Sequence, residues 1–417
     1  MFTLALKSLY NRKFTSILTV ASIALSVTLL LGVEQIRTEA KNSFTNTISG
    51  TDLIVGARTG PVQLLLYSVF RIGNATNNIS WQSYQDIARN PNVKWTIPIS
   101  LGDSHQGYRV MGTNTDYFEY FRFAGGLQLQ MSKGQIFSEV FHAVLGADVA
   151  ETLNYALGDE MIIAHGAGKV SLIKHDDKPF TVVGILKPTG TPVDQTVHVQ
   201  LEGIEAIHID WQGGARIPGM SISAEKALQM NLSPKTITAF LVGLKSRIAA
   251  FSFQRQVNQY PHEALLAILP GVALQELWDL ISIAEKALLV VSGLVVLVGL
   301  SGMLIALMTS LNERRREMAI LRSVGARPWQ VFTLIVGEST LLTLAGITAG
   351  IGSLYGLLWV SQEFILSQFG IFIAVRGLSS YEMLLIIIVC LAGIIIGIIP
   401  GYRIYRYSLA DGMTIRI

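Results

Sequence analysis

Four long apolar runs constrain the fold of this chain more than any other feature of its sequence. Each is close to or above the ~20 residues that a helix needs to cross the hydrocarbon core of a bilayer. Helices that are apolar on all sides are typical of membrane spans. The runs therefore predict a polytopic α-helical membrane protein with spans at residues 14–33, 285–311, 331–360 and 383–402.

The composition supports this fold class and excludes several functions. Only 15% of the residues are charged, whereas roughly a quarter is usual in soluble domains. The net charge is +3, and the arginines gather beside the apolar runs, so nucleic acid is not an expected partner. Cys390 is the only cysteine and lies inside an apolar run, which excludes disulfides and cysteine metal sites.

A segment of soluble character, residues 34–284, lies between the first two spans. It has no comparable apolar run, and turn residues separate short alternating stretches such as residues 178–186. The segment is long enough for a core of its own, and we expect a large α+β domain outside the cytoplasm. Its flanks, residues 34–48 and 263–284, have helical periodicity. We expect each flank to continue a membrane helix outward as a stalk.

The distribution of basic residues predicts the orientation in the membrane. The short loop 361–382 contains a single basic residue, Arg376, whereas the other short segments are rich in lysine and arginine. Cytoplasmic loops carry the excess of positive charge. Both termini and the connection 312–330 are therefore expected in the cytoplasm (N-in, C-in), and residues 34–284 are expected outside.

The two ends of the chain are basic and short. Residues 1–13 contain Lys7, Arg12 and Lys13 and are expected to form an amphipathic segment on the membrane surface. The apolar run that follows is longer than a signal-peptide core, and no small-x-small cleavage site follows it, so we expect an uncleaved span. Residues 403–417 are expected to form a cytoplasmic tail.

The densest charge in the chain lies between the second and third spans. Met318, Leu321 and Val324 recur there every three residues, which predicts a short helix with a narrow apolar stripe beside a charged face. Gly325 suits the left-handed residue that ends a helix, and Pro328 prevents its continuation. The segment can dock a partner or simply anchor the topology, and the residues alone leave both open. Its charged residues are Glu313, Arg314, Arg315, Arg316, Glu317, Arg322 and Arg327.

Small residues and one acid stand out within the spans. Glycines four apart allow helix backbones to approach closely, and because four spans enclose little space for a substrate path, we expect a dimer. Glu338 indicates either a functional intramembrane carboxylate or a group near the helix start that faces headgroups or the loop arginines. The glycine pairs are Gly346 and Gly350, Gly352 and Gly356, and Gly393 and Gly397.

No nucleotide site is expected in this chain. The stretch His165-Gly-Ala-Gly-Lys169 resembles the end of a phosphate-binding loop. However, Ile163 stands where the opening glycine is required, and Val170 occupies the Ser/Thr position. We therefore expect no catalytic and no cofactor-binding residues.

The histidines raise the question of a metal. All seven fall in residues 34–284, which is equally expected if polar residues have no place in the spans. Their spacings match no compact ligand set, and His262-Glu263 lacks the second zinc ligand because position 266 is Leu266. We expect no metal site, and metal binding stays open as an alternative. The histidines are His105, His142, His165, His175, His198, His208 and His262.

Several stretches together have the pattern of one family. They are the connection ERRREMAILRSVGARPWQV at residues 313–331, the following Gly337-Glu338-Ser339, the external residues 143–163 and 180–192, and the basic tail. The chain resembles the MacB/FtsX-like (type VII) permeases of bacterial ABC transporters. Residues 52–123 and 202–260 match no motif of that family.

The resemblance implies a four-span subunit that pairs with a second permease, identical or paralogous, and binds two copies of a separate ABC ATPase. That ATPase would use the ATP and Mg²⁺, because this chain lacks a phosphate loop and is not expected to be an enzyme. Its closure would move the external domain, which is mechanotransmission. The coupling residues implied are Glu313, Arg314, Arg315, Arg316, Glu317, Leu321, Arg322, Gly325 and Pro328.

The resemblance also implies a location and a class of cargo. We expect a multi-pass protein of a bacterial inner membrane, in contact with lipids and with a large periplasmic domain. The leading expectation is efflux of a periplasmic substrate with an adaptor and an outer-membrane channel. Lipoprotein extraction, regulation of a periplasmic hydrolase, and binding or export of a metal or metal chelate through the histidines are the alternatives.

Overall fold

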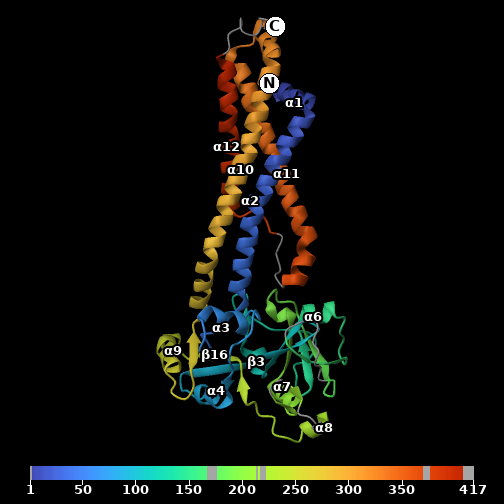
Figure 1. Ribbon diagram of the computed structural model, residues 1–417, viewed down its shortest axis with the longest axis vertical. Helices are drawn as coiled ribbons and strands as arrows, with labels where there is room; N and C mark the ends of the chain where they lie inside the picture. Colours follow the sequence, from blue (N-terminus) through green and yellow to red (C-terminus); the bar gives the residue numbers. More distant parts are fainter. Residues whose placement is uncertain (1, 167–175, 213–214, 217–221, 370–375, 407–417) are drawn as a thin grey trace. The chain divides into compact units, whose positions relative to one another are not determined.

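The structure is a computed structural model of the 417-residue chain that describes residues 2–166, 176–212, 215–216, 222–369 and 376–406. The chain forms two compact units (Figure 1). Unit 1 consists of Met1–Ala40, Ser282–Ser367 and Ile373–Ile417. Unit 2 consists of Lys41–Ile281 and Gln368–Phe372.

Unit 1 is helical. Among its described residues, four helices are long and apolar enough to cross a membrane, by length and composition. They expose large apolar side chains such as Leu25, Val298, Leu357 and Ile395, which is the expected surface for lipid contact. Its helices are α1 (Phe2–Asn11), α2 (Lys13–Thr47), α10 (Pro270–Ser323), α11 (Pro328–Phe369) and α12 (Ser380–Tyr405), of which α2, α10 and α11 continue in sequence into unit 2.

The helix bounds correct two expectations. Residues 263–269 are not part of a stalk helix, because Leu265–Ile268 forms strand β17 and α10 begins at Pro270. The charged connection is not a separate short helix either. Its residues continue α10 without a break to Ser323, and only residues 324–327 lie between α10 and α11.

Unit 2 is built on an 11-stranded mixed sheet in the order β17-β1-β16-β3-β4-β12-β8-β11-β7, with β10 paired to β3 and β9 paired to β11. Three two-stranded pairs accompany it, β13–β14, β15–β2 and β5–β6. The strands are β1 (Leu53–Ala57), β2 (Ile79–Ser80), β3 (Val93–His105), β4 (Tyr108–Thr113), β5 (Arg122–Phe123), β6 (Leu127–Gln128), β7 (Met131–Gly134), β8 (His142–Leu145), β9 (Glu160–Met161), β10 (Ala164–His165), β11 (Phe180–Leu186), β12 (Thr196–Gln200), β13 (Trp211–Gln212), β14 (Ala215–Arg216), β15 (Thr236–Ile237), β16 (Ala239–Leu244) and β17.

Short helices cover both faces of this sheet (Figure 1). On β16, Leu241 packs into a cluster with residues of α3 and α5, while its neighbours Phe240 and Val242 pack with α4 and α9. The alternation follows from the two-residue period of a strand. A third cluster joins β8, β11 and β12 to α6 and α7. The helices are α3 (Pro61–Ser68), α4 (Trp81–Ala88), α5 (Asp116–Tyr120), α6 (Ala147–Thr152), α7 (Leu201–His208), α8 (Ala224–Ala227), α9 (Ala250–Asn258) and the 3₁₀ turns η1 (Pro192–Gln195) and η2 (Arg247–Ala249).

A tight hairpin fixes the register of the central strands β3 and β4. Gln106 and Gly107 connect them, and both have positive φ, 48° and 93°. Two such residues form the turn whose twist matches that of the flanking strands. The hairpin holds the end of β3 against β10, where His165 lies opposite Asp103.

Candidate functional site

The charged connection is the end of α10 and the turn that follows it. The amide of Ala326 donates to the carbonyl of Leu321 over 3.0 Å, and the amide of Gly325 donates to that of Arg322 over 3.1 Å. With Gly325 at φ 102°, these bonds form the Schellman ending of a helix. Pro328 is the first residue of α11. Proline is tolerated there because the first N–H groups of a helix have no intrahelical hydrogen-bond acceptor. Gly325 and Pro328 therefore set the turn between two long helices.

The apolar side chains at this turn face different ways. Leu321 is half-buried and packs against a cluster of unit 1 that includes Leu311, Val331 and Ile404. Val324 is 83% exposed. The apolar stripe expected from the spacing of three residues is thus divided between the interior and the surface.

The exposed apolar residues at the turn were not all predicted. Ile320 and Trp329 are 57% and 54% exposed and lie on either side of Val324 in the sequence. Sequence reasoning passed over both, because an aromatic residue at the start of an apolar span looks like part of that span. Exposed aromatic side chains beside arginines are typical of interfaces.

The structure describes the side chains of only some of the charged residues at this turn. Glu317 is exposed and Arg322 is half-buried. The side chains of Glu313, Arg314, Arg315 and Arg316 lie outside what the structure describes, so their docking role stays a prediction.

Glycines let α11 approach α2 closely. A Cβ at Gly346 would lie 2.6 Å from Ile23, and a Cβ at Gly350 would lie 2.8 Å from Val27. At the same place the hydroxyl of Thr28 donates to the carbonyl of Gly350 over 3.0 Å. Close backbone approach and interhelical hydrogen bonds both hold membrane helices together. These two glycines therefore lie at a helix–helix contact within this chain.

The second helix contact of α11 is with α12. A Cβ at Gly393 would meet the side chain of Thr343, and a Cβ at Gly397 would meet the side chain of Ser339. Thr343 and Ser339 are fully buried. Glycine on α12 thus makes room for hydroxyl-bearing side chains on α11.

The remaining glycine pair differs. A Cβ at Gly352 or at Gly356 would have nothing within 4 Å, and both residues are exposed. Within the described part of the chain, this pair makes no helix contact.

Glu338 lies inside α11 and is 2% exposed. Ser339, which follows it, is fully buried. Both interpretations of Glu338, as a functional intramembrane carboxylate and as a group that faces headgroups or the loop arginines, stay predictions.

An ionic network joins three helices of unit 1. Nε of Arg376 lies 2.7 Å from a carboxylate oxygen of Glu39 on α2, and Nη2 lies 3.2 Å from one of Glu382 on α12. The hydroxyl of Tyr355 on α11 donates to the carbonyl of Arg376 over 2.8 Å. Glu382 also forms a capping box with Ser379 at the start of α12. Sequence reasoning used Arg376 only as a topological marker.

A neighbouring ion pair adds α10 to this set. Arg37 of α2 lies 2.7 Å from Glu34 and 3.5 Å from Glu285 on α10. The segments of α2 and α10 that continue in sequence into unit 2 are therefore linked by charge within unit 1.

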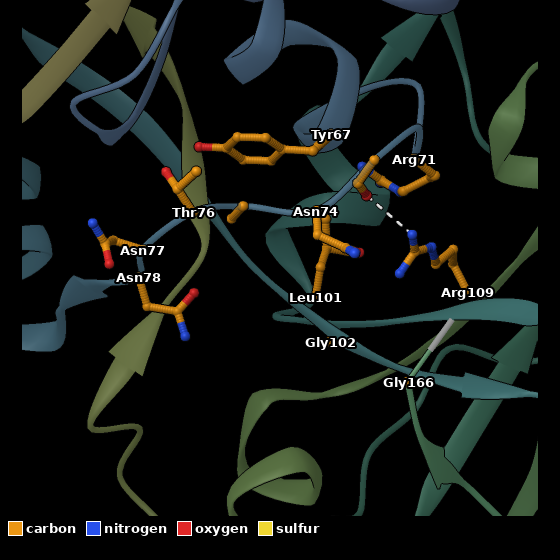
Figure 2. A pocket seen from close by; sticks show the side chains of 12 residues that line it. Tyr67, Arg71, Asn74, Thr76, Asn77, Asn78, Leu101, Gly102, Arg109 and Gly166 are labelled. Atoms are coloured by element: carbon orange, nitrogen blue, oxygen red, sulfur yellow. Dashed lines mark hydrogen bonds between the residues drawn. The ribbon is translucent and has the colours of Figure 1, made fainter. Parts of the chain in front are cut away.

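Unit 2 contains a polar pocket of about 440 Å³ (Figure 2). Arg109 donates to the carbonyl of Gly73 over 3.0 Å at one side of it. Arg71, at φ 61°, donates to the carbonyl of Ser68. Its volume is in the range of ligand sites, and its guanidinium and amide groups favour a polar or anionic molecule. The lining residues include Tyr67, Asn74, Thr76, Asn77, Asn78, Leu101, Gly102 and Gly166.

Two of the described histidines, His198 and His105, have structural environments. His198 is fully buried, its Nδ1 lies 3.2 Å from the carbonyl of Val144, and burial lowers its pKa to about 3. His105 contacts the carbonyl of Ile162 and the hydroxyl of Tyr155. His175 falls in a stretch that the structure does not describe, as does most of the phosphate-loop-like sequence.

Two histidines instead converge on a carboxylate. Nδ1 of His165 lies 3.0 Å from Oδ1 of Asp103, and Nε2 of His208 lies 3.6 Å from the same oxygen. Burial opposes ionisation of Asp103, but the hydrogen bonds from both histidines outweigh it and lower the pKa of the carboxyl below its ordinary value. Burial likewise opposes protonation of His208, and its interactions with Asp103 raise the pKa overall.

Comparison with protein families decides the class of the chain. The FtsX-like permease C-terminal family matches residues 289–409. The MacB-like periplasmic core domain family matches residues 16–260, which is more than half of the chain. The chain belongs to the MacB/FtsX-like permease family. Residues 52–123 and 202–260, in which the sequence shows no motif of the family, lie within the second match.

Membership agrees with the four apolar helices. The MacB/FtsX-like permeases are generally non-catalytic transporter subunits, and this one is a multi-pass membrane protein with a large extracytoplasmic domain. The match to the MacB-like core includes most of unit 2, and the match to the FtsX-like part includes α11, α12 and the end of α10.

Individual relatives align over limited regions. Over 66 residues the chain is 41% identical to the uncharacterized ABC transporter permease YknZ of Bacillus subtilis (strain 168), and this alignment spans 16% of the chain and 17% of that relative. The periplasmic region of MacB from Actinobacillus actinomycetemcomitans is 11% identical, with a TM-score of 0.33, over 55% of this chain and 94% of that chain. The extracellular domain of the noncanonic ABC-type transporter YknZ from Gram-positive bacteria is 13% identical, with a TM-score of 0.30, over 52% and 99%.

Proposed function

We propose that this MacB/FtsX-like permease is the membrane subunit of an ABC transporter and that it binds a separate ATPase at the end of α10. The family supports the permease role, and the name of the Bacillus subtilis relative supports the transporter class. The charged end of α10 and the exposed Ile320, Val324 and Trp329 would form the docking surface. Arginines would supply the polar contacts of this surface, and the exposed apolar side chains would supply buried area.

The observation that carries the proposal is the length of α10. This helix has 54 residues, from Pro270 in unit 2 to Ser323 at the charged connection. At 1.5 Å per residue its length is about 80 Å. One continuous helix therefore connects the proposed docking end to unit 2, and a displacement of that end would be transmitted along it. α2 offers a second route of the same kind, because it runs to Thr47.

The ionic network of unit 1 supports coupled movement of these helices. Arg376 joins α2 to the start of α12, and Arg37 joins α2 to α10. Because Glu39 and Glu382 are almost fully buried, separating them from Arg376 would leave desolvated charges, which is costly. The helices that lead to unit 2 would therefore move together.

The remaining parts of the proposal follow the family. Two ATPase copies would use ATP and Mg²⁺ and bind a pair of permeases, with both termini of each in the cytoplasm and unit 2 in the periplasm. Efflux of a periplasmic substrate through an adaptor and an outer-membrane channel is the leading role. The polar pocket of unit 2 is consistent with a soluble cargo rather than an acyl chain.

Co-purification with the ATPase tests the docking surface. Replacing Arg314, Arg315 and Arg316 with Ala should strongly reduce the amount of ATPase that co-purifies with the membrane-inserted permease. A matched control replaces three exposed lysines of unit 2, Lys94, Lys133 and Lys226, with Ala and removes the same charge. Equal recovery of ATPase by both variants would refute the docking surface.

A further inference from the structure

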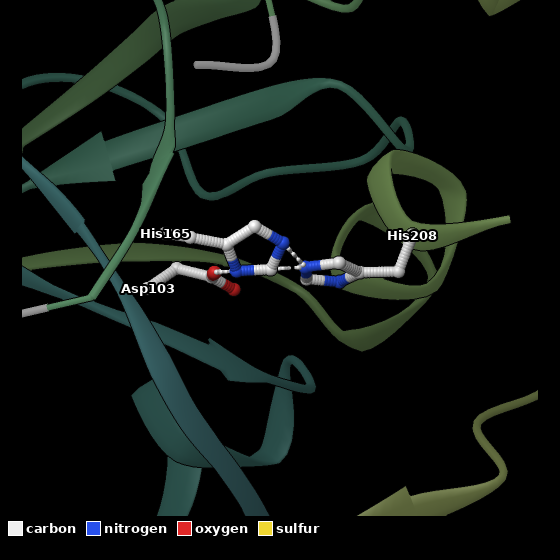
Figure 3. A group of neighbouring side chains, drawn as sticks. All are labelled: Asp103, His165 and His208. Atoms are coloured by element: carbon white, nitrogen blue, oxygen red, sulfur yellow. Dashed lines mark hydrogen bonds and ion pairs between the residues drawn. The ribbon is translucent and has the colours of Figure 1, made fainter. Parts of the chain in front are cut away.

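Among the residues that the structure describes, Asp103, His165 and His208 of unit 2 form a cluster whose ligand atoms could hold a metal ion (Figure 3). Its residues come from three elements. His165 of β10 lies opposite Asp103 of β3 in an antiparallel pair, so the two side chains project from the same face of the sheet. His208 is the last residue of α7, which brings it to that face.

The spacing of the three ligand atoms fits one face of a tetrahedron. Oδ1 of Asp103 and Nδ1 of His165 are 3.0 Å apart, and Nε2 of His208 lies 3.4 Å from that nitrogen and 3.6 Å from that oxygen. With metal–ligand bonds of about 2.0–2.2 Å, the ligands of a tetrahedral zinc ion are about 3.3–3.6 Å apart. Small shifts of these side chains would complete the geometry.

A backbone hydrogen bond orients the ring of His208 in the way that is usual for metal-binding histidines. Nδ1 of His208 lies 2.8 Å from the carbonyl of Ile204, so its N–H donates to the backbone and Nε2 points at the cluster. A backbone carbonyl in this role fixes the tautomer of metal-binding histidines. His165 packs edge-on against Trp211, with ring centroids 4.8 Å apart, which limits its rotation.

The two imidazoles of the cluster also approach each other closely. Nε2 of His208 and Nε2 of His165 are 3.0 Å apart, and two unprotonated nitrogens repel at this distance. Either an N–H of one ring or a bound cation therefore separates the two lone pairs. Asp103 is 4% exposed, and a buried carboxylate favours a nearby cation over water.

Exposure distinguishes this cluster from a closed structural site. The side chains of His165 and His208 are 25% and 26% exposed, whereas that of Asp103 is 5% exposed. Three protein ligands with one open side are typical of sites that keep a position for water or an exchangeable ligand. Gly102 and Gly166, the chain neighbours of Asp103 and His165, line the polar pocket described above.

We propose that Asp103, His165 and His208 bind one divalent transition-metal ion, of the type that imidazole and carboxylate ligands prefer, such as Zn²⁺. The ion links β3 and β10 to the end of α7. It exchanges through the open side of the cluster. The site goes beyond the proposed transport role, and its occupancy does not depend on the ATPase.

Zinc titration of the full-length permease tests this site. The protein is purified in detergent through a tag without histidine and is stripped with a chelator, and Zn²⁺ binding is measured by calorimetry together with the melting temperature. We expect one high-affinity Zn²⁺ per chain and a higher melting temperature with zinc. His208→Gln and His165→Gln should each weaken binding by at least about tenfold.

A matched variant and a metal-free measurement make the result decisive. His262→Gln changes an exposed histidine that packs on Tyr260 and should bind Zn²⁺ as the unmodified chain does. The melting temperature of each variant without metal distinguishes loss of the metal site from loss of the fold. If His208→Gln does not fold, the proposal is tested with His165→Gln alone. Absence of zinc binding by the unmodified chain, or undiminished binding by a folded His165→Gln or His208→Gln variant, overturns the proposal.

Discussion

Arg376 holds Glu39 at 2.7 Å from its Nε, although the two residues are 337 positions apart in the sequence. The contact joins the C-terminal part of α2 to the segment before α12 and is completed by Glu382, which is 1% exposed. One arginine therefore neutralises two almost fully buried carboxylates.

Replacing this arginine should destabilise the membrane unit. Arg376→Ala removes the charge-assisted hydrogen bonds to Glu39 and Glu382 and should lower the free energy of unfolding by about 2 kcal/mol. Denaturant unfolding in detergent measures the loss. Arg247→Ala is the control, because Arg247 is 84% exposed and lies 3.5 Å from Asp52, and it should cost no more than about 0.5 kcal/mol. Similar losses for both variants would contradict the assignment.

Two glycine substitutions on α11 should have opposite effects. Gly346→Ala places a Cβ 2.6 Å from Ile23 and should cost about 1–3 kcal/mol of stability through overpacking. Gly352→Ala meets nothing within 4 Å and should gain up to about 1 kcal/mol, because alanine favours a helix. Thermal unfolding in the same detergent compares them. Destabilisation by Gly352→Ala would instead point to a contact with another chain.

Protonation of His198 should weaken unit 2 in acid. Burial, with Arg71 nearby, lowers the pKa of His198 to about 3, whereas the unfolded chain titrates near 6.5. The unfolded state therefore binds the proton more readily between these values, and stability falls as the pH drops from about 6.5 toward 3. His198→Gln should flatten the pH dependence of the unfolding midpoint over this window, and His262→Gln should leave it unchanged. An unaltered slope in folded His198→Gln would refute the assignment.

The turn after α10 should be sensitive to a side chain at one position. Gly325 has φ 102°, and a β-branched residue there costs at least about 1–2 kcal/mol locally. Gly325→Val should therefore displace the start of α11 and reduce both ATPase co-purification and ATP hydrolysis by the reconstituted complex. Gly337→Ala, with no atom within 4 Å of the new Cβ, serves as the control. Unchanged ATPase binding by Gly325→Val would separate the turn from docking.

The sequence predicts those parts of the fold that depend on local pattern. Span-length apolar runs identify α2, α10, α11 and α12, and the left-handed preference of glycine identifies the turn at Gly325. By contrast, Leu265–Ile268 is a strand because it pairs with β1, which lies about two hundred residues earlier. A four-residue apolar segment is equally compatible with a strand and with the start of a helix. Only pairing with the distant strand β1 determines that it is a strand.

The Asp103 cluster escaped prediction for a related reason. Its members are far apart in the chain, and no fixed spacing encodes a site that a sheet register and a helix end assemble together. The only local signal was the histidine content of the external segment, which does not tell His165 and His208 from the buried His198. The arginines proposed to dock the ATPase are the opposite case. Their sequence pattern is clear, but the side chains of Arg314, Arg315 and Arg316 lie outside what the structure describes.

The unbroken course of α10 has a mechanical consequence. Between Pro270 and Ser323 the helix has no internal proline, the residue that most strongly kinks or breaks a helix. A straight helix of about 80 Å that tilts by about 5° carries its far end through about 7 Å. In the function proposed above, α10 would act as a lever arm, in which a small rotation at the end that docks the ATPase becomes a larger displacement at the opposite end.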